Sequence, residues 1–156
     1  MLPHVVLREV ADTDLPAFFR HQADPEAAAM AAFPSREAEA FKAHWEKIRR
    51  DPTVVVRSVL YNGELAGNIG SFELEGRRTV GYWLGRDFWG KGVATRALED
   101  FLRVEHARPL SALVAQHNLA SIRVLEKCGF VRVEARKGES LGGGPPVDEF
   151  VMRLDG

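Results

Sequence analysis

Two spacings of apolar positions alternate along the chain, and together they predict a mixture of strands and helices. Valine-rich or alternating runs predict strands, whereas apolar positions three and four residues apart predict helices. We expect strands over residues 5–10, 53–61, 64–74, 79–85, 110–117, 131–137 and 147–154. We expect a first helix that begins near residues 12–14 and further helices over residues 37–50, 92–106 and 118–128. Residues 22–36 should form a broken helix. This order predicts a mixed sheet with helices packed on it and excludes an all-helical or all-β fold.

Short glycine-containing sequences predict where the chain turns. Asn62-Gly63 is the dipeptide that most favours a two-residue hairpin turn, because both residues accept positive φ. Glu75-Gly76 follows the next predicted strand. Residues 53–85 should therefore form an antiparallel meander of three strands. Gly129 follows the last predicted helix and suits the left-handed position beyond a helix C-terminus.

Composition narrows the class of protein mainly by exclusion. The 156 residues suffice for one domain over residues 1–156, and the formal net charge of -1 gives no basic surface for nucleic acid. No apolar run approaches the ~20 residues that span a bilayer. Cys128 is the single cysteine, and the histidines lack a zinc-binding spacing. We therefore expect a cytoplasmic protein with no disulfide, no metal, no membrane association and no nucleic acid partner.

The run from Trp89 to Thr95 carries the clearest chemical signal. It follows a predicted strand and opens a predicted helix, and Gly90 and Gly92 would let an anion approach the backbone amides. A helix N-terminus has unpaired N–H groups and a partial positive charge, so a diphosphate can bind there. A P-loop is excluded because Lys91 is followed by Gly92 instead of serine or threonine. A dinucleotide fingerprint is excluded because the run follows an antiparallel meander.

The glycines alone leave a structural alternative open, in which they only make a tight connection between a strand and a helix. A second motif, Asn118-x-x-Ser121, opens the next predicted helix after a buried strand. On its own this motif is equally compatible with a helix N-cap.

Taken together, three segments resemble the GCN5-related N-acetyltransferase (GNAT) family, and specifically its Rim-type, ribosomal-protein branch. The segments are Gly81-Tyr82-Trp83-Leu84-Gly85, Trp89-Gly90-Lys91-Gly92-Val93-Ala94-Thr95 and Asn118-x-x-Ser121-x-x-Val124-Leu125-Glu126-Lys127-x-Gly129-Phe130. The resemblance implies a single-domain α/β (α+β mixed) fold. Its sheet would be mostly antiparallel, with about seven strands, splayed at the cofactor site, and about four helices would pack on both faces. The implied reaction is direct attack of a primary amine on acetyl-CoA, with no covalent acetyl-enzyme.

The resemblance also implies which residues bind coenzyme A. The amides from Gly90 to Thr95 would bind the pyrophosphate, the splayed strand at Trp83 and Leu84 would pair with the pantetheine, and Asn118 would bind the same arm. The implied set is Trp83, Leu84, Gly90, Lys91, Gly92, Val93, Ala94, Thr95, Asn118 and Ser121.

The catalytic groups are less clear from the sequence. Many relatives place a tyrosine acid seven residues after the asparagine, but here that position is Leu125. Rim-type members share the leucine and use the serine, so Ser121 is the expected acid or thiolate-stabilising group. Glu139 is the expected general base, with Glu73 and His117 as alternatives. Cys128 fits a packing residue on its helix better than a nucleophile.

The acceptor stays open between a protein N-terminal α-amine and a small-molecule amine. A non-catalytic acyl-CoA-binding regulatory module is the alternative function, and a purely structural protein is the third. The apolar edges of the C-terminal strands are compatible with a homodimer.

Overall fold

A seven-stranded sheet lies at the centre of the computed structural model, which describes residues 4–31, 35–137 and 148–156. The strands are β1 (Val5–Arg8), β2 (Val55–Tyr61), β3 (Glu64–Leu74), β4 (Arg77–Leu84), β5 (Leu110–Ala115), β6 (Val131–Arg136) and β7 (Glu149–Leu154). Their order across the sheet is β1-β2-β3-β4-β5-β7-β6, and only β4 and β5 pair in parallel. The predicted mixed, mostly antiparallel sheet is confirmed.

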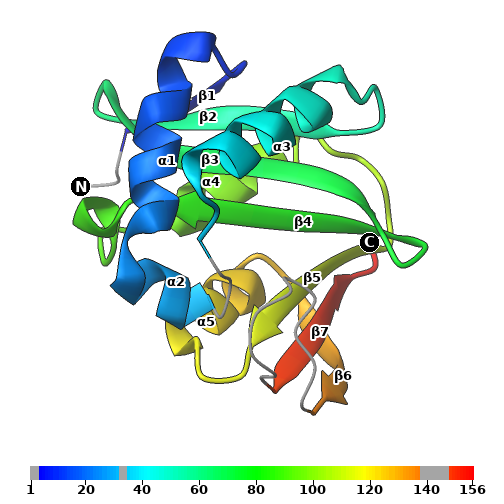
Figure 1. Ribbon diagram of the computed structural model, residues 1–156. Coiled ribbons are helices and arrows are strands. Elements are labelled where there is room, and N and C mark those ends of the chain that lie inside the picture. Colours follow the sequence, from blue (N-terminus) through cyan, green and yellow to red (C-terminus); the bar gives the residue numbers. More distant parts are fainter. Residues whose placement is uncertain (1–3, 32–34, 138–147) are drawn as a thin grey trace.

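Five α-helices pack against the sheet in the part of the chain that the structure describes. They are α1 (Leu15–Ala23), α2 (Pro25–Ala31), α3 (Ala38–Arg50), α4 (Val93–Phe101) and α5 (Leu119–Lys127). Figure 1 shows α1 and α3 on one face of strands β2 to β4, with α4 behind these strands on the other face. α2 lies within residues 22–36, where the sequence predicts a broken helix, and it begins at Pro25, a residue well suited to the first position of a helix.

The central meander forms as the sequence predicts. β2 pairs with β3 from Val55–Ser71 to Tyr61–Glu64, and β3 pairs with β4 from Gly67–Leu84 to Leu74–Arg77. Both connecting dipeptides adopt positive φ: 50° and 85° at Asn62 and Gly63, and 52° and 75° at Glu75 and Gly76. Left-handed backbone at both central positions gives the twist that a two-residue hairpin needs.

Apolar clusters attach the helices to the sheet. The larger cluster contains the buried side chains of α4 and α5 together with those of the central strands, including Ile69, Val80 and Leu84. A smaller cluster joins α1 to α3 through Phe18, Phe41 and Trp45. The Phe18 and Trp45 rings lie 5.0 Å apart between centroids, which is typical of packed aromatic pairs.

The helix predicted over residues 92–106 is shorter in the structure, because α4 ends at Phe101. The Phe101 carbonyl accepts hydrogen bonds from the amides of both Val104 and Glu105, which closes the last turn. The Glu105 carboxylate is turned inward, where it accepts hydrogen bonds from Ser71 and Arg78. The last turn thus tightens after Phe101, and the residues beyond it that the apolar spacing includes lie outside the helix.

The sheet splits between β4 and β5. These two strands share the single register pair Thr79–Ser111, whereas β5 pairs with β7 along its whole length. Beyond Thr79 the two strands diverge (Figure 1). The split leaves the β5-facing edge of β4 available to another extended chain, as the resemblance predicts.

Candidate active site

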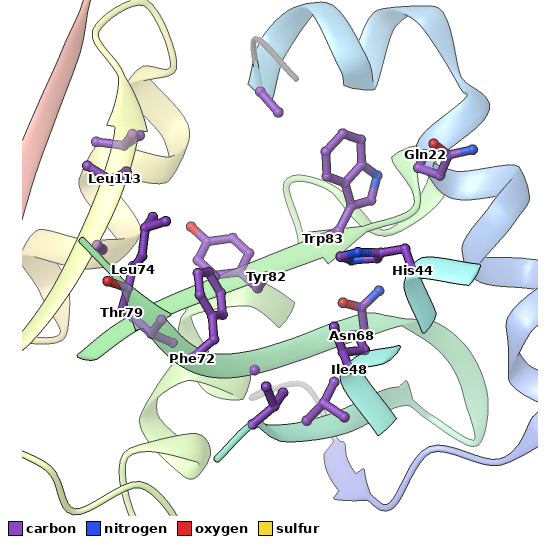
Figure 2. Close-up of a pocket in the computed structure, with 18 of the residues that line it drawn as sticks. Gln22, His44, Ile48, Asn68, Phe72, Leu74, Thr79, Tyr82, Trp83 and Leu113 are labelled. Carbon is purple, nitrogen blue, oxygen red and sulfur yellow. The ribbon is translucent and has the colours of Figure 1, made fainter. Parts of the chain in front are cut away.

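A cavity of about 560 Å³ opens where β4 leaves β5. Its lining comes from β2 to β5 and β7, from α1, α2, α3 and α5, and from the segments between them. Figure 2 shows Tyr82 and Trp83 as neighbours on β4: the Tyr82 hydroxyl points toward the side on which Leu113 lies, and Trp83 lies nearer to Gln22 and His44. Gly81, which directly precedes Tyr82 on β4, lines the cavity with its backbone alone.

The glycine turn connects β4 to α4 through a short 3₁₀ turn, Arg86–Phe88. Gly90 and Gly92 adopt φ values of 73° and 78°, and Gly92 is the N-cap of α4. Residues other than glycine rarely adopt this backbone conformation, so the glycines are needed for the turn itself. The first α4 hydrogen bond joins the Arg96 amide to the Gly92 carbonyl, so the amides of residues 93–95 lie before it.

This turn fits a diphosphate. A Cβ atom placed on Gly90 would have no heavy atom within 4 Å, so the backbone faces open space on that side. Exposed amides at a helix N-terminus are the usual protein partners of a pyrophosphate. Val93 is only 1% exposed and packs in the core, so it would contribute its backbone amide alone. The Lys91 ammonium lies 5.8 Å from the centre of the Tyr61 ring.

Trp83 and Leu84 end β4 immediately before the turn. The indole N–H of Trp83 donates to the His21 carbonyl and fixes α1 beside the strand. The Leu84 carbonyl accepts from the indole of Trp89, and the Gly85 amide donates to the Ala66 carbonyl. These bonds hold the end of β4 against β3 and the turn, and they leave the split on the β5 side open.

Asn118 and Ser121 meet at the start of α5. The Asn118 side-chain oxygen accepts a hydrogen bond of 3.3 Å from the Ser121 amide, so Asn118 is the N-cap of this helix. The capping bond uses the amide oxygen and leaves the side-chain N–H groups for another partner. Both residues line the cavity, so capping and binding are compatible roles.

Tyr82 is a residue of this site that the sequence reasoning missed. Its hydroxyl lies 2.6 Å from the Ser121 hydroxyl and forms a hydrogen bond with it. Burial raises the pKa of Tyr82 to about 12, so the side chain stays a neutral phenol. The one sequence signal for Tyr82 is its position on β4, because side chains two residues apart lie on the same face of a strand. Tyr82 thus shares a face with Val80 and Leu84, which are buried in the larger apolar cluster with side chains of α4 and α5.

Of the three expected bases, the structure describes Glu73 and His117, and neither lines the cavity. Glu139 lies outside the described residues. Glu73 is 57% exposed and lies 3.7 Å from Arg78, and His117 contacts the Ala29 carbonyl. Neither Glu73 nor His117 is among the described residues that line the cavity. Glu149, which the sequence reasoning also missed, does line it and is only 8% exposed.

Leu125 and Cys128 have packing roles on α5. Leu125 is 2% exposed and belongs to the main core cluster. The Cys128 thiol donates to the Thr95 carbonyl across the α4–α5 contact, and burial raises its pKa to about 11. A thiol in this state is a poor nucleophile at neutral pH, as expected from the sequence.

Comparison with known proteins identifies the family of this chain. The family model for the acetyltransferase (GNAT) domain matches residues 4–131. A search of curated protein sequences finds no match. A solved acetyltransferase structure is 31% identical, with a TM-score of 0.73, and the alignment covers 97% of this chain and 86% of that one.

Two further structures extend the likeness at lower identity. Spermidine N-acetyltransferase from Vibrio cholerae, in complex with CoA and spermine, has a TM-score of 0.83 at 18% identity, over 97% of this chain and 95% of that one. Ribosomal-protein-alanine N-acetyltransferase from Brucella melitensis has a TM-score of 0.80 at 19% identity, over 96% and 99%.

The chain therefore belongs to the GNAT acetyltransferase family. The predicted enzyme class, an acetyl-CoA-dependent N-acetyltransferase, is confirmed. Among the residues described, no three histidine, cysteine or acidic side chains lie close enough to hold a metal ion. In the same part of the chain no helix is both long and apolar enough to cross a membrane.

Proposed function

We propose that this protein binds acetyl-CoA along the split between β4 and β5 and transfers its acetyl group to a primary amine. The proposal rests on three features of this region. The turn at Gly90 follows the end of β4 and opens α4, and the open edge of β4 and Ser121 line the same cavity. The Vibrio cholerae relative, which shares the fold, was solved with CoA bound.

Each part of the cofactor has a matching group in this chain. The amides from Gly90 to Thr95 bind the pyrophosphate at the N-terminus of α4. The β5-facing edge of β4, through Trp83 and Leu84, pairs with the amides of the pantetheine, as an added strand pairs with a sheet edge. Asn118 donates its side-chain N–H groups to the same arm, which directs the thioester toward Ser121.

The chemistry needs three functions from the protein: a base for the incoming ammonium, a donor to the thioester oxygen and a stabilising group for the leaving thiolate. In this proposal Ser121 stabilises the leaving thiolate. For the base we propose a carboxylate at the acceptor side, either Glu149, which is buried in the cavity wall, or Glu139.

The acceptor is a primary amine, either a protein N-terminal α-amine or a small molecule. The Vibrio cholerae and Brucella melitensis relatives support different classes of acceptor, since one is named for spermidine and the other for a ribosomal-protein alanine. The lining of the whole cavity is mostly apolar and aromatic, with Arg36, Asp51 and Glu149 as its charged groups among the described residues. A single amine on an apolar or peptide body fits this lining better than a chain of several cationic amines.

The test is release of free thiol from acetyl-CoA in the presence of an amine panel. The panel holds peptides with a free N-terminus, the same peptides with a blocked N-terminus, polyamines and small monoamines. Thiol release with at least one amine, reduced in Glu149→Gln or Glu139→Gln, supports the proposal. Tight binding of acetyl-CoA without release by any amine would point instead to a non-catalytic acyl-CoA-binding module.

A further inference from the structure

Two hydroxyl groups meet in the wall of the cavity from opposite sides of the split sheet. Tyr82 comes from β4 and Ser121 from the first turn of α5, and their oxygens are 2.6 Å apart. The third hydroxyl in the described lining belongs to Thr79, and it donates to the Arg77 carbonyl. Tyr82 and Ser121 are thus the hydroxyls placed to act on a group in the cavity.

The surroundings of the pair restrict how it can be oriented. The Ser121 backbone is held by the Asn118 cap, so its hydroxyl can change direction only by rotation about its own side chain. Each hydroxyl has one hydrogen and can donate once. When Tyr82 donates to Ser121, the Ser121 hydrogen is free to point at a second acceptor in the cavity.

We propose that Tyr82 is a positioning residue that donates its hydrogen bond to Ser121 and thereby aims the Ser121 hydroxyl at the sulfur of coenzyme A. This inference rests on the proposed function of the site. As the C–N bond forms and the C–S bond breaks, the electron pair of the C–S bond stays on sulfur. The resulting thiolate accepts the hydrogen bond from Ser121 and later takes a proton from water, while the amine proton passes to the carboxylate base. Tyr82 loses no proton in this step.

The properties of Tyr82 suit this role. Burial raises the pKa of its phenol, so the side chain keeps its hydrogen throughout the pH range in which the enzyme works. Hydrogen bonds in series polarise one another, so a donor behind Ser121 strengthens the bond that Ser121 gives to an anion. The bond also joins β4 to α5 across the split, so it depends on the same geometry that admits the pantetheine.

The test is the pKa of the coenzyme A thiol when it is bound to the protein, read from the ultraviolet absorbance of the thiolate as pH is raised. It needs no knowledge of the acceptor. Tyr82→Phe should raise the bound thiol pKa by about one unit, a tenfold weaker stabilisation of the thiolate. Tyr61→Phe is the matched control, since Tyr61 is the other of the two tyrosines and a phenylalanine ring keeps its contacts with Phe88 and Lys91; this variant should match the wild type.

A second variant acts in the opposite direction and preserves the tyrosine shape. Replacement of tyrosine by 3-fluorotyrosine in the Tyr61→Phe protein changes only Tyr82 and makes its phenol a stronger donor, which should lower the bound thiol pKa. Acetyl transfer by Tyr82→Phe should show a lower kcat with an unchanged KM for acetyl-CoA.

The outcomes separate the two proposals. If Tyr82→Phe and the fluorinated protein bind coenzyme A with the wild-type thiol pKa, the positioning role is wrong and the proposed function stands. If the wild type itself does not bind coenzyme A, the proposed function fails and this inference fails with it.

Discussion

Asn118 accepts a hydrogen bond from the Ser121 amide, and this one contact joins the stability of α5 to the candidate active site. The cap uses the side-chain oxygen of Asn118, while cofactor binding in our account uses its N–H groups. The two roles of one side chain can therefore be separated by substitution.

Asn118→Asp keeps an N-cap oxygen but removes the side-chain N–H donors. We expect it to keep wild-type stability and to lose affinity for coenzyme A, since a carboxylate cannot donate to the pantetheine. Asn118→Ala should lose the same affinity and also about 1 kcal/mol of stability. Calorimetric titration and thermal unfolding of both variants check this. Wild-type affinity in Asn118→Asp would show that Asn118 is a cap only.

Asp14 should make the stability of the fold depend on pH. Asp14 is 3% exposed, and its carboxylate accepts hydrogen bonds from Arg8, Ser58 and the Ala11 amide. The Arg8 guanidinium holds the pKa of Asp14 well below its ordinary value in the folded protein. The stabilisation is therefore complete above the unfolded pKa of about 4 and is lost as pH falls below it.

Asp14→Asn should lower the free energy of unfolding at pH 7 by about 2 kcal/mol, and the difference from wild type should shrink below pH 4. The matched control is Asp12→Asn. Asp12 pairs with Arg49 but its side chain is 91% exposed, so the expected loss is below about 1 kcal/mol. Urea unfolding at several pH values measures both. A constant difference between Asp14→Asn and wild type from pH 7 to pH 3 would contradict the assignment.

Gly85 is required because α1 packs directly against the end of β4. A Cβ atom on Gly85 would lie 2.7 Å from the His21 ring, closer than real contacts allow. Gly85→Ala should therefore displace His21 and destabilise the protein by about 1 to 3 kcal/mol. At Gly81 the added Cβ would lie 3.7 Å from Phe72, an ordinary contact, so Gly81→Ala should be nearly neutral in stability. Equal melting temperatures for the two variants would contradict this packing.

Local sequence patterns predict most of the fold. The hairpin dipeptides, the glycine turn before α4 and the Asn118 cap each act within a few residues, so their positions can be inferred from the sequence. The contact of Glu105 with Ser71, 34 residues away in the chain, could not be inferred in this way, because it forms only in the folded protein.

The candidate site also combines a feature set by local sequence with features that depend on contacts distant in the sequence. The phosphate-binding turn is a local motif, and the sequence identifies it. Tyr82 and Glu149 were missed because each lies in a strand whose residues look like sheet packing, and only the separation of β4 from β5 brings them into the cavity. Glu73 and His117 were plausible by residue type, but the sheet register and the α5 junction place them outside the described lining.

The central claim is that the turn at Gly90 binds the pyrophosphate of coenzyme A, and Gly90→Glu tests it with Gly76→Glu as a closely matched control. The two glycines have φ values of 73° and 75°, and neither has a heavy atom within 4 Å of an added Cβ. The two substitutions should therefore cost similar backbone strain. Only the side chain at residue 90 brings a negative charge against the amides of α4.

The most direct measurement is calorimetric titration of wild type, Gly90→Glu and Gly76→Glu with coenzyme A. We expect wild type and Gly76→Glu to bind alike and Gly90→Glu to bind at least ~10-fold more weakly, a loss of ~1.4 kcal/mol or more. Equal affinity in all three proteins, or no binding by the wild type, would contradict the account.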